Sequence, residues 1–315
     1  MNASVFTATL GQMAFLAILI LTGFVLARFK LVPTEGVKIL SRLENLLLIP
    51  AFVTGTFLNR FTVETLSAAW KIFLGSFLLA GIVIAVSIPC VRLCTKDSFL
   101  RRIYLYGLSF SNFGFMGNAV VAALFPEILP EYLIFTMALW ILIDLWGVPS
   151  LLMGEDAEEK PTVKQRLRKL LNPMFIGMLL GMIVGISGLP VPAFVSGAIT
   201  SVGDCMSPIA MLITGMTVAQ LDFRTVFRTK SIYAVTVLRL LVYPLVFLGI
   251  FYFLPLPTVF EACAICSLAM PLGLNTVVVP SAYGRDPTAA ASMALVSHLF
   301  SCLTIPFIFW LLSLI

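Results

Sequence analysis

The sequence predicts an all-α integral membrane protein whose ten transmembrane helices form two inverted repeats of five helices. Three observations lead to this prediction. Of the 315 residues, 60% are hydrophobic and 11% are charged, the apolar stretches match the thickness of a bilayer, and basic residues gather in alternate loops. A soluble domain carries roughly one quarter charged residues, because its surface faces water. The bilayer is therefore the solvent for most of this chain.

Ten apolar runs are long enough to cross the hydrocarbon core, which takes about 20 residues in a helix. We number them as spans one to ten. They cover residues 7–28, 37–58, 69–94, 103–125, 131–153, 172–188, 193–219, 230–254, 259–283 and 288–314. No basic residue precedes the first apolar run, so this run is not predicted to be a cleavable signal peptide.

The basic residues predict the orientation of the spans. Loops on one side hold 17 of the 20 Lys and Arg residues, the opposite loops hold Arg60 and Lys71, and Arg239 lies inside span eight. Cytoplasmic loops are enriched in basic residues. We therefore expect a plasma-membrane protein with both termini external and a cytoplasmic central loop. The 17 residues are Arg28, Lys30, Lys38, Arg42, Arg92, Lys96, Arg101, Arg102, Lys160, Lys164, Arg166, Arg168, Lys169, Arg224, Arg228, Lys230 and Arg285.

The central loop also divides the chain into two halves. Residues 1–153 form the first repeat, residues 154–171 the cytoplasmic linker and residues 172–315 the second repeat. Because five is odd, the second half enters the membrane from the opposite side, as an inverted repeat requires. The sequence shows weak echoes of this symmetry, since Pro50 in span two has a counterpart in Pro208 of span seven.

Composition and motifs exclude several classes of function. The net charge of +5 lies in short loops, and no basic surface interleaved with aromatic residues points to nucleic acid. Cys263 and Cys266 have the spacing of a redox or metal pair, but no second pair or His cluster accompanies them, so no metal site is predicted. Hydrolase, Walker and haem motifs are absent from the sequence. We therefore expect no enzyme activity and no cofactor.

Spans four and nine are the two most interrupted by residues that disfavour a regular helix. Span four contains three Gly, two Asn and two Ser between Gly107 and Asn118, and span nine carries Pro271 and Pro280 around Gly273 and Asn275. Proline removes a donor and clashes with the preceding turn. Broken helices at matching places in two repeats are typical of a transporter's binding site. The alternative is that these residues only permit close packing.

A broken helix presents unpaired amides and the positive end of its dipole to an anion. Asn112 and Asn275 would add side-chain amides that donate to a carboxylate. Elsewhere, Gly177, Gly181 and Gly185 in span six have the spacing that lets two helices approach closely. We expect that approach to be mainly within the chain, the alternative being a dimer contact.

Ionisable side chains inside spans are rare and usually functional. Asp144, Asp204, Arg239 and His298 are the candidates for coupling transport to protons, and Glu44 lies closer to an interface. A carboxylate that titrates at depth would carry a proton. The alternative is a structural ion pair of Arg239 with one of the two aspartates, and the sequence leaves both interpretations open. His298 is expected to be a hydrogen-bonded core residue.

Several motifs resemble the auxin efflux carrier family, and the resemblance extends over nearly the whole chain. Residues 172–181, which read Asn-Pro-Met-Phe-Ile-Gly-Met-Leu-Leu-Gly, resemble the family's sixth-span motif. Residues 112–117, Asn-Phe-Gly-Phe-Met-Gly, are similar to its fourth-span Gly-Phe-x-Gly signature. Met270-Pro271 with Asn275, and Tyr-Gly-Arg-Asp at residues 283–286, fit its C-terminal half.

This resemblance implies a scaffold domain and a transport domain, broken helices that cross near the midplane, elevator-like motion and, in several relatives, a homodimer. Many relatives have a proline at the fourth-span crossing, where this chain has Ser111-Asn112 followed by Gly117-Asn118, which implies a softer break and a different substrate. The predicted substrate-binding residues are Ser111, Asn112, Phe113, Gly114, Asn118, Pro271, Leu272 and Asn275, and the predicted helix breaks lie at Pro50, Pro208, Pro271 and Pro280.

The predicted function is secondary transport of a small organic anion, and the resemblance implies a mono- or dicarboxylate such as malonate, malate or an auxin-like acid. Two alternatives stay open. A sodium-coupled symporter with the fold of bile-acid transporters would need a cage of oxygen ligands near the crossing, and no dense acidic cluster lies there. A membrane-embedded sensor of a ligand or lipid would usually carry a further cytoplasmic domain.

Overall fold

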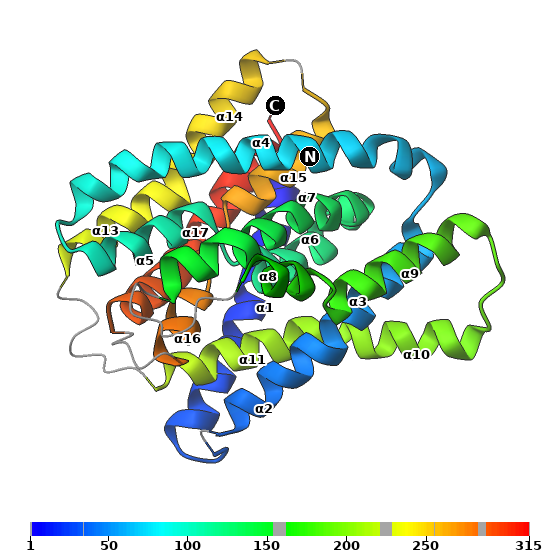
Figure 1. Cartoon of the computed structure of the whole chain (residues 1–315), viewed down its shortest axis with the longest axis horizontal. Helices are drawn as coiled ribbons and strands as arrows, with labels where there is room; N and C mark the ends of the chain where they lie inside the picture. The colour runs from blue at the N-terminus through cyan, green and yellow to red at the C-terminus, as the bar shows by residue number, and fades with distance from the viewer. Residues whose placement is uncertain are drawn as a thin grey trace.

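The computed structural model describes residues 2–33, 35–153, 162–220, 229–254, 256–282 and 288–314. Within these ranges the chain is almost entirely helical, and the helices pack into one body around a buried apolar core (Figure 1). Part of the predicted linker, residues 154–161, and the motif at residues 283–286 lie outside the described residues. The labels below keep η for π-helical turns, with η3 a short 3-10 turn.

The elements follow the order of the predicted spans. The first half contains α1 (Asn2–Arg28), α2 (Glu35–Leu43), η1 (Glu44–Leu48), α3 (Ile49–Arg60), α4 (Val63–Cys94), α5 (Ser98–Ser109), η2 (Phe113–Gly117), α6 (Asn118–Leu124), η3 (Pro126–Ile128), α7 (Leu129–Leu142) and η4 (Ile143–Leu152). The second half contains α8 (Val163–Leu170), α9 (Pro173–Ser187), α10 (Ala193–Asp204), α11 (Met206–Val218), α13 (Lys230–Val237), η5 (Leu238–Val242), α14 (Tyr243–Phe253), α15 (Thr258–Leu268), α16 (Asn275–Ala282) and α17 (Thr288–Leu312).

Six helical segments among the described residues are long and apolar enough to cross a membrane. They are Phe6–Arg28, Val63–Cys94, Pro126–Leu152, Ala193–Val218, Lys230–Phe253 and Thr288–Leu312. Three shorter apolar helices, Phe113–Leu124, Pro173–Ser187 and Thr258–Leu268, accompany them. The chain is therefore an all-helical, multi-pass membrane protein.

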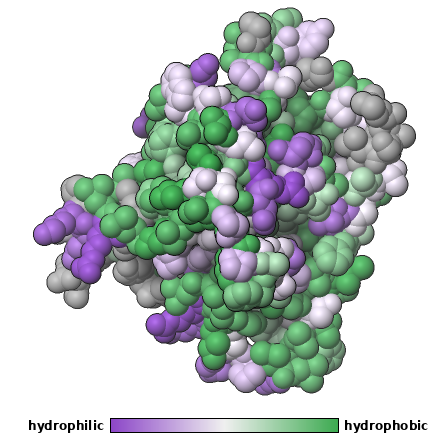
Figure 2. All heavy atoms as spheres, turned by 90° about the vertical axis from the view of Figure 1, so that its right-hand side faces the viewer, coloured by the Kyte–Doolittle hydropathy of each residue, from purple (hydrophilic) through white to green (hydrophobic). Residues whose placement is uncertain are grey.

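Apolar side chains cover much of the outer surface, as a lipid environment requires. Leu93, Phe194 and Leu303 are 88%, 79% and 71% exposed. Figure 2 shows this distribution on the end of the molecule formed by α3, α9 and α10, where hydrophobic residues predominate and hydrophilic ones gather in patches. Exposed leucines and phenylalanines carry no cost where acyl chains surround them, because lipid tails are as apolar as these side chains.

Glycine allows two helix pairs to pack unusually closely. The predicted ladder in α9 lies against α3, where a Cβ atom on Gly181 would come within 2.7 Å of the Thr54 carbonyl oxygen and one on Gly185 within 2.6 Å of the Phe57 carbonyl oxygen. Gly215 of α11 lies in the same way against the backbone of α1. Because a side chain at these positions would collide with backbone, the close approach within the chain that the spacing predicted is confirmed.

Several π-helical turns lie next to prolines. Pro50 follows η1, Pro149 lies inside η4 and Pro244 follows η5. A proline lacks the N–H that would continue the regular ladder, and a widened turn accommodates the loss. Pro208 comes just after the turn at Cys205 that separates α10 from α11. Pro280 was predicted to mark a break, but α16 continues through it to Ala282.

Candidate functional site

Two non-helical segments meet inside the molecule. Residues 110–112 separate α5 from η2, and residues 269–274 separate α15 from α16. The Asn112 N–H donates to the Pro271 carbonyl oxygen at 2.7 Å, and Ser111 and Leu272 form an isolated antiparallel bridge. We call these two segments the crossing. They satisfy each other's backbone groups, which an irregular segment at membrane depth must do.

Side chains complete the hydrogen bonding of the crossing. The Ser111 hydroxyl donates to the Ser267 carbonyl oxygen at 2.8 Å. The Leu272 N–H donates to the Ser297 hydroxyl of α17 at 3.2 Å. Ser111, Asn112 and Leu272 are each at most 6% exposed. The crossing is therefore a buried, well-bonded junction that brings spans four, nine and ten together.

A small cavity lies on the side of the crossing where η2 and α16 begin, which we call the N-terminal pole. Its volume is about 20 Å³, room for about one water molecule. The first N–H groups of a helix have no partner within that helix, and the opening residues of both helices line the cavity. The lining residues are Tyr106, Ser111, Asn112, Phe113, Gly114, Phe115, Trp140, Ile143, Gly273, Leu274 and Asn275.

Two asparagine amides at the N-terminal pole have defined partners. The Asn275 Nδ2 donates to the Tyr106 hydroxyl at 3.0 Å. The Asn112 Nδ2 lies 3.1 Å from the His298 Nε2, and the His298 Nδ1 lies 2.7 Å from the Ala294 carbonyl oxygen. A carbonyl only accepts, so Nδ1 carries the proton and Nε2 accepts from Asn112. Each amide is thus held by a residue of another element.

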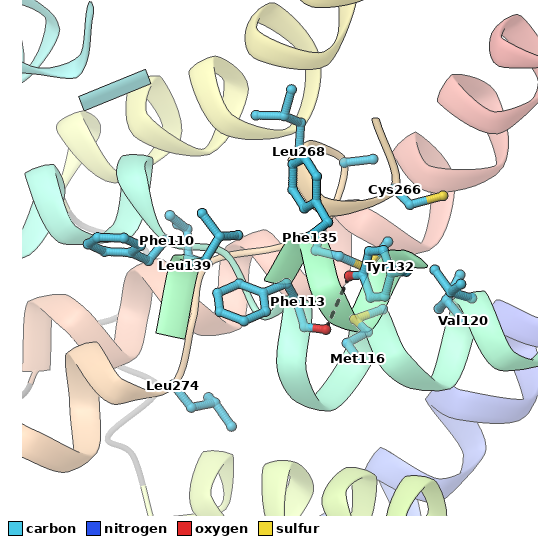
Figure 3. Packing of buried hydrophobic residues seen from close by; sticks show 14 of the residues in the cluster. Phe110, Phe113, Met116, Val120, Tyr132, Phe135, Leu139, Cys266, Leu268 and Leu274 are labelled. Carbon is cyan, nitrogen blue, oxygen red and sulfur yellow. Dashed lines mark hydrogen bonds between the residues drawn. The ribbon is translucent and has the colours of Figure 1, made fainter. Parts of the chain in front are cut away.

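Aromatic side chains line one wall of the cavity at the N-terminal pole. The Phe113 and Trp140 rings meet edge to face with centroids 5.2 Å apart. Trp140 also explains Gly114, because a Cβ atom there would lie 2.6 Å from the indole ring. The Tyr132 hydroxyl donates to the Phe113 carbonyl oxygen at 3.2 Å, among the apolar side chains drawn in Figure 3. The surroundings are apolar, with few polar groups, as is typical of ligand pockets.

The opposite side of the crossing, where α5 and α15 end, contains Arg239; we call it the C-terminal pole. The last carbonyl groups of a helix lack intrahelical partners and form the negative end of its dipole. Arg239 Nη1 donates to Leu108 at 2.9 Å, Nη2 to Ser267 at 3.0 Å and Nε to Met270 at 3.3 Å, in each case to the carbonyl oxygen. One buried guanidinium therefore serves both helix ends.

The C-terminal pole also contains a cavity of about 20 Å³, lined by Ser76, Leu79, Ala80, Val83, Ser109, Phe135, Leu139, Arg239, Ser267 and Leu268. The Ser109 hydroxyl oxygen is buried and has no hydrogen-bond partner. Arg239 donates to carbonyl oxygens rather than to Asp144 or Asp204, so the structural ion pair that the sequence left open is not what the structure contains.

The crossing unites most of the predicted substrate-binding residues but not all of the predicted coupling residues. Asn118 does not line the N-terminal cavity; it is 4% exposed and its Oδ1 is buried without a hydrogen-bond partner. Asp144 is half-buried in η4, and Asp204 is exposed at the end of α10. His298 touches the crossing directly.

A larger cavity of about 270 Å³ lies between α3 and α10 on one side and α6 and α7 on the other. Its polar lining residues are Thr56, Asn59, Arg60, Thr200 and Asp204. Arg60 also donates through Nη1 to the Pro126 carbonyl oxygen at 2.6 Å. This cavity is the place where the structure puts Asp204, away from the Arg239 contacts.

Three residues that contact the crossing were not predicted from the sequence. Tyr106 accepts from Asn275, Ser297 accepts from the Leu272 N–H, and Trp140 lines the cavity. Tyr106 directly precedes the interrupted part of span four, so position in the chain was its one available signal. Trp140 and Ser297 lie in other spans, and no local pattern marks them. Among the described residues, no group of three or more His, Cys, Asp or Glu side chains is arranged to hold a metal ion.

A search among curated proteins finds no match to this chain. A comparison with protein families does find one, and it covers almost all of the sequence. Residues 8–309 match the family described as membrane transport protein, which is of the auxin efflux carrier type. The match includes both segments of the crossing and every helix that contacts them. The chain therefore belongs to this family of membrane transporters.

Proposed function

We propose that this protein is a secondary transporter of a small organic anion, a mono- or dicarboxylate such as malonate, malate or an auxin-like acid. The observation that carries the proposal is the N-terminal pole, where the first turns of two helices and the amides of Asn112 and Asn275 converge on one apolar-walled cavity. Helix N-termini favour anions through free N–H groups and the helix dipole. A carboxylate is a small organic group that can accept hydrogen bonds from free N–H groups and carries the negative charge that the helix dipole favours.

The helix pairs support a fold of two inverted repeats with broken fourth and ninth spans. α1 packs on α11 and α3 packs on α9, which pairs span one with seven and span two with six. Exchanging the two halves of the chain converts each of these pairs into the other. The contacts of α4 with α7 and of α13 with α17 are related in the same way, and the crossing maps onto itself.

We further propose an elevator mechanism, in which spans three to five and eight to ten move against a scaffold of spans one, two, six and seven. α3, α9 and α10 pack together on the right of the molecule in Figure 1, whereas α5 and α13 lie on the left. The 270 Å³ cavity lies between α3 and α10 of the scaffold and α6 and α7 of the moving part. The scaffold is the part that would form the homodimer that several relatives adopt.

The C-terminal pole argues against the sodium-coupled alternative. A sodium ion would need carbonyl and carboxylate oxygens near the crossing. Arg239 already donates to the carbonyl groups of Leu108, Ser267 and Met270, which are oxygens of the kind that sodium would need. A second cation beside this guanidinium would be repelled. The basic-residue pattern supports an orientation with external termini and a cytoplasmic central loop. We propose that this orientation is adopted in the plasma membrane.

Uptake into proteoliposomes tests the proposal. We expect purified protein to exchange radiolabelled malonate or malate across the bilayer, and Asn112→Ala to reduce this rate at least tenfold, since a hydrogen bond to a charged group contributes about 1.5–3 kcal/mol. Asn45→Ala, at an exposed asparagine of η1 whose amide donates to the Ser41 carbonyl oxygen, is the matched control and should exchange at a rate close to wild type. Wild-type exchange by Asn112→Ala would remove the crossing from the binding site.

A further inference from the structure

The hydrogen bond between Asn112 and His298 connects the proposed binding site to an ionisable ring. In the neutral ring, Nδ1 donates to the Ala294 carbonyl oxygen and the Nε2 lone pair accepts from the Asn112 amide at 3.1 Å. His298 is 6% exposed and Asn112 is 3% exposed. The ring is fixed on one side by its own helix, so any change in its protonation acts on Asn112.

We propose that His298 is the proton-binding site that couples anion binding at the crossing to one proton, acting through Asn112. This inference rests on the proposed function. A proton from the aqueous phase adds to the Nε2 lone pair, so that both ring nitrogens carry hydrogens. Nε2 can then no longer accept, and the Asn112 amide turns so that its Oδ1 accepts from Nε2–H. Its NH₂ group, previously engaged, becomes available to the cavity.

This reversal changes what the cavity offers an anion. With the neutral ring, one Asn112 N–H is committed to His298. With the protonated ring, both N–H groups can donate to a carboxylate, and a positive charge lies behind them. Charge-assisted donors of this kind bind anions more strongly than neutral ones. His298 is therefore a positioning residue, which tunes the affinity of Asn112 without touching the substrate itself.

Several ionisable groups lie on the helices that pack against α17, the helix of His298. Among these helices, α1 contributes no ionisable group before Arg28, and α16 contributes none. The groups contributed by the other elements are Lys230, Tyr233, Arg239, Arg101, Arg102, Tyr104, Tyr106, Tyr243, Tyr252, Glu261, Cys263 and Cys266, and α17 itself adds Cys302.

Of these groups, Arg239 and Tyr106 share hydrogen bonds with the crossing and its flanking residues. Arg239 is cationic, so it opposes a second positive charge nearby. A buried imidazolium without a counter-ion is costly, and so is a buried anion. Each stabilises the other when both are present. Because coupling between two ligands is reciprocal, the anion draws the proton in as strongly as the proton draws the anion.

The test measures how anion affinity depends on pH, using a carboxylate that stays ionised between about pH 6 and pH 8. If one proton binds with each anion, the apparent Kd of the wild type rises about tenfold per pH unit. His298→Gln cannot be protonated, and its Kd should change less than about twofold across the same range, whatever its absolute value. A weakly buffered solution should show one proton taken up per anion by wild type and none by the variant.

Two matched controls test whether the pH dependence of anion affinity comes from His298 or from any change at a buried polar residue. Glu44 is a buried carboxyl whose two oxygens have no hydrogen-bond partner, and it lies in η1 outside the crossing. Ser301 donates to the His298 carbonyl oxygen at 2.7 Å and so contacts the same turn of helix. Glu44→Gln and Ser301→Ala should both keep the tenfold slope of wild type.

The outcomes distinguish this inference from the proposed function. A tenfold slope in wild type that His298→Gln abolishes supports the inference. A slope that persists in His298→Gln, or that Glu44→Gln abolishes instead, overturns it while leaving anion transport in place. Wild-type exchange with no pH dependence also overturns it. If the wild type neither binds nor exchanges any organic anion tested, the proposed function fails, and the inference fails with it.

Discussion

The two poles of the crossing differ in how the protein satisfies the helix ends that meet there. At the C-terminal pole, Arg239 donates hydrogen bonds to carbonyl groups at the ends of α5 and α15. At the N-terminal pole, the amides of η2 and α16 face a cavity walled by Trp140 and Tyr106. Both kinds of helix end carry partial charge and lack partners within the helix for some of their backbone groups. The protein therefore pairs the carbonyl ends with its own side chain, whereas the amide ends border a cavity, and the proposed anion site rests on this difference.

This comparison separates residues that hold the crossing together from residues that serve the ligand. A change at the C-terminal pole should reduce stability, because it removes the hydrogen-bond donor of buried carbonyl groups. Under the proposed function, a change at the N-terminal pole should instead reduce anion binding, because the amides there would donate to the substrate. The predictions below follow in order of expected effect.

Arg239→Ala should destabilise the protein most. The substitution removes the guanidinium from three buried carbonyl groups, of which Ser267 keeps the Ser111 hydroxyl as a donor. A hydrogen bond to a charged group contributes about 1.5–3 kcal/mol. We expect a loss on the order of 3 kcal/mol or more, measured as a lower midpoint of thermal unfolding in detergent. The unfolding midpoint of Arg239→Lys should lie between those of wild type and Arg239→Ala, because an ammonium group keeps the charge but cannot reproduce the planar guanidinium. Wild-type stability in Arg239→Ala would show that the carbonyl groups do not need the guanidinium.

Asn275→Asp should abolish anion uptake without unfolding the protein. The carboxylate keeps the size of the amide but replaces a donor with a negative charge at the start of α16. That charge repels an anionic substrate. We expect uptake to fall at least about 100-fold, with Asn275→Ala falling about tenfold, each hydrogen bond being worth about 1.5–3 kcal/mol. Gel filtration in detergent checks that both variants remain folded. Undiminished uptake by Asn275→Asp would contradict an anion site at this pole.

Tyr106→Phe should have a smaller effect, because Tyr106 holds Asn275 rather than the substrate. Loss of its hydroxyl removes the acceptor 3.0 Å from the Asn275 Nδ2, and a neutral hydrogen bond contributes about 1 kcal/mol. We expect the apparent affinity for the anion to weaken about fivefold. The matched control is Tyr104→Phe, whose hydroxyl is bonded to Ser231 instead. Equal effects in the two variants would argue that neither acts through Asn275.

Replacing sodium with potassium in the uptake buffer should change nothing measurable. The carbonyl oxygens of Leu108, Ser267 and Met270 at the C-terminal pole already accept from Arg239, and the guanidinium would repel a second cation beside them. The measurement is the initial rate of malonate uptake at fixed pH in the two salts. A rate that depends on sodium would restore the sodium-coupled alternative and would direct the search for its ligands elsewhere in the chain.

The sequence by itself determined that this is a multi-pass membrane protein, because composition and run length decide which solvent surrounds a chain. It also predicted close packing at Gly181, since small residues at that spacing have a direct steric consequence. The interruptions near Asn112 and Pro271 could be located for the same reason, since Asn, Gly and Pro affect the backbone at their own positions.

Only the tertiary structure decided which partners those residues have. Asn112 and His298 are 186 residues apart, and Arg239 reaches a carbonyl group 131 residues away. No local pattern encodes such pairs, so Arg239 could equally have been assigned to an aspartate, and His298 could be assigned only to the core. A local signal fixes what a backbone segment can adopt, whereas the packing of spans distant in sequence fixes what each polar group meets.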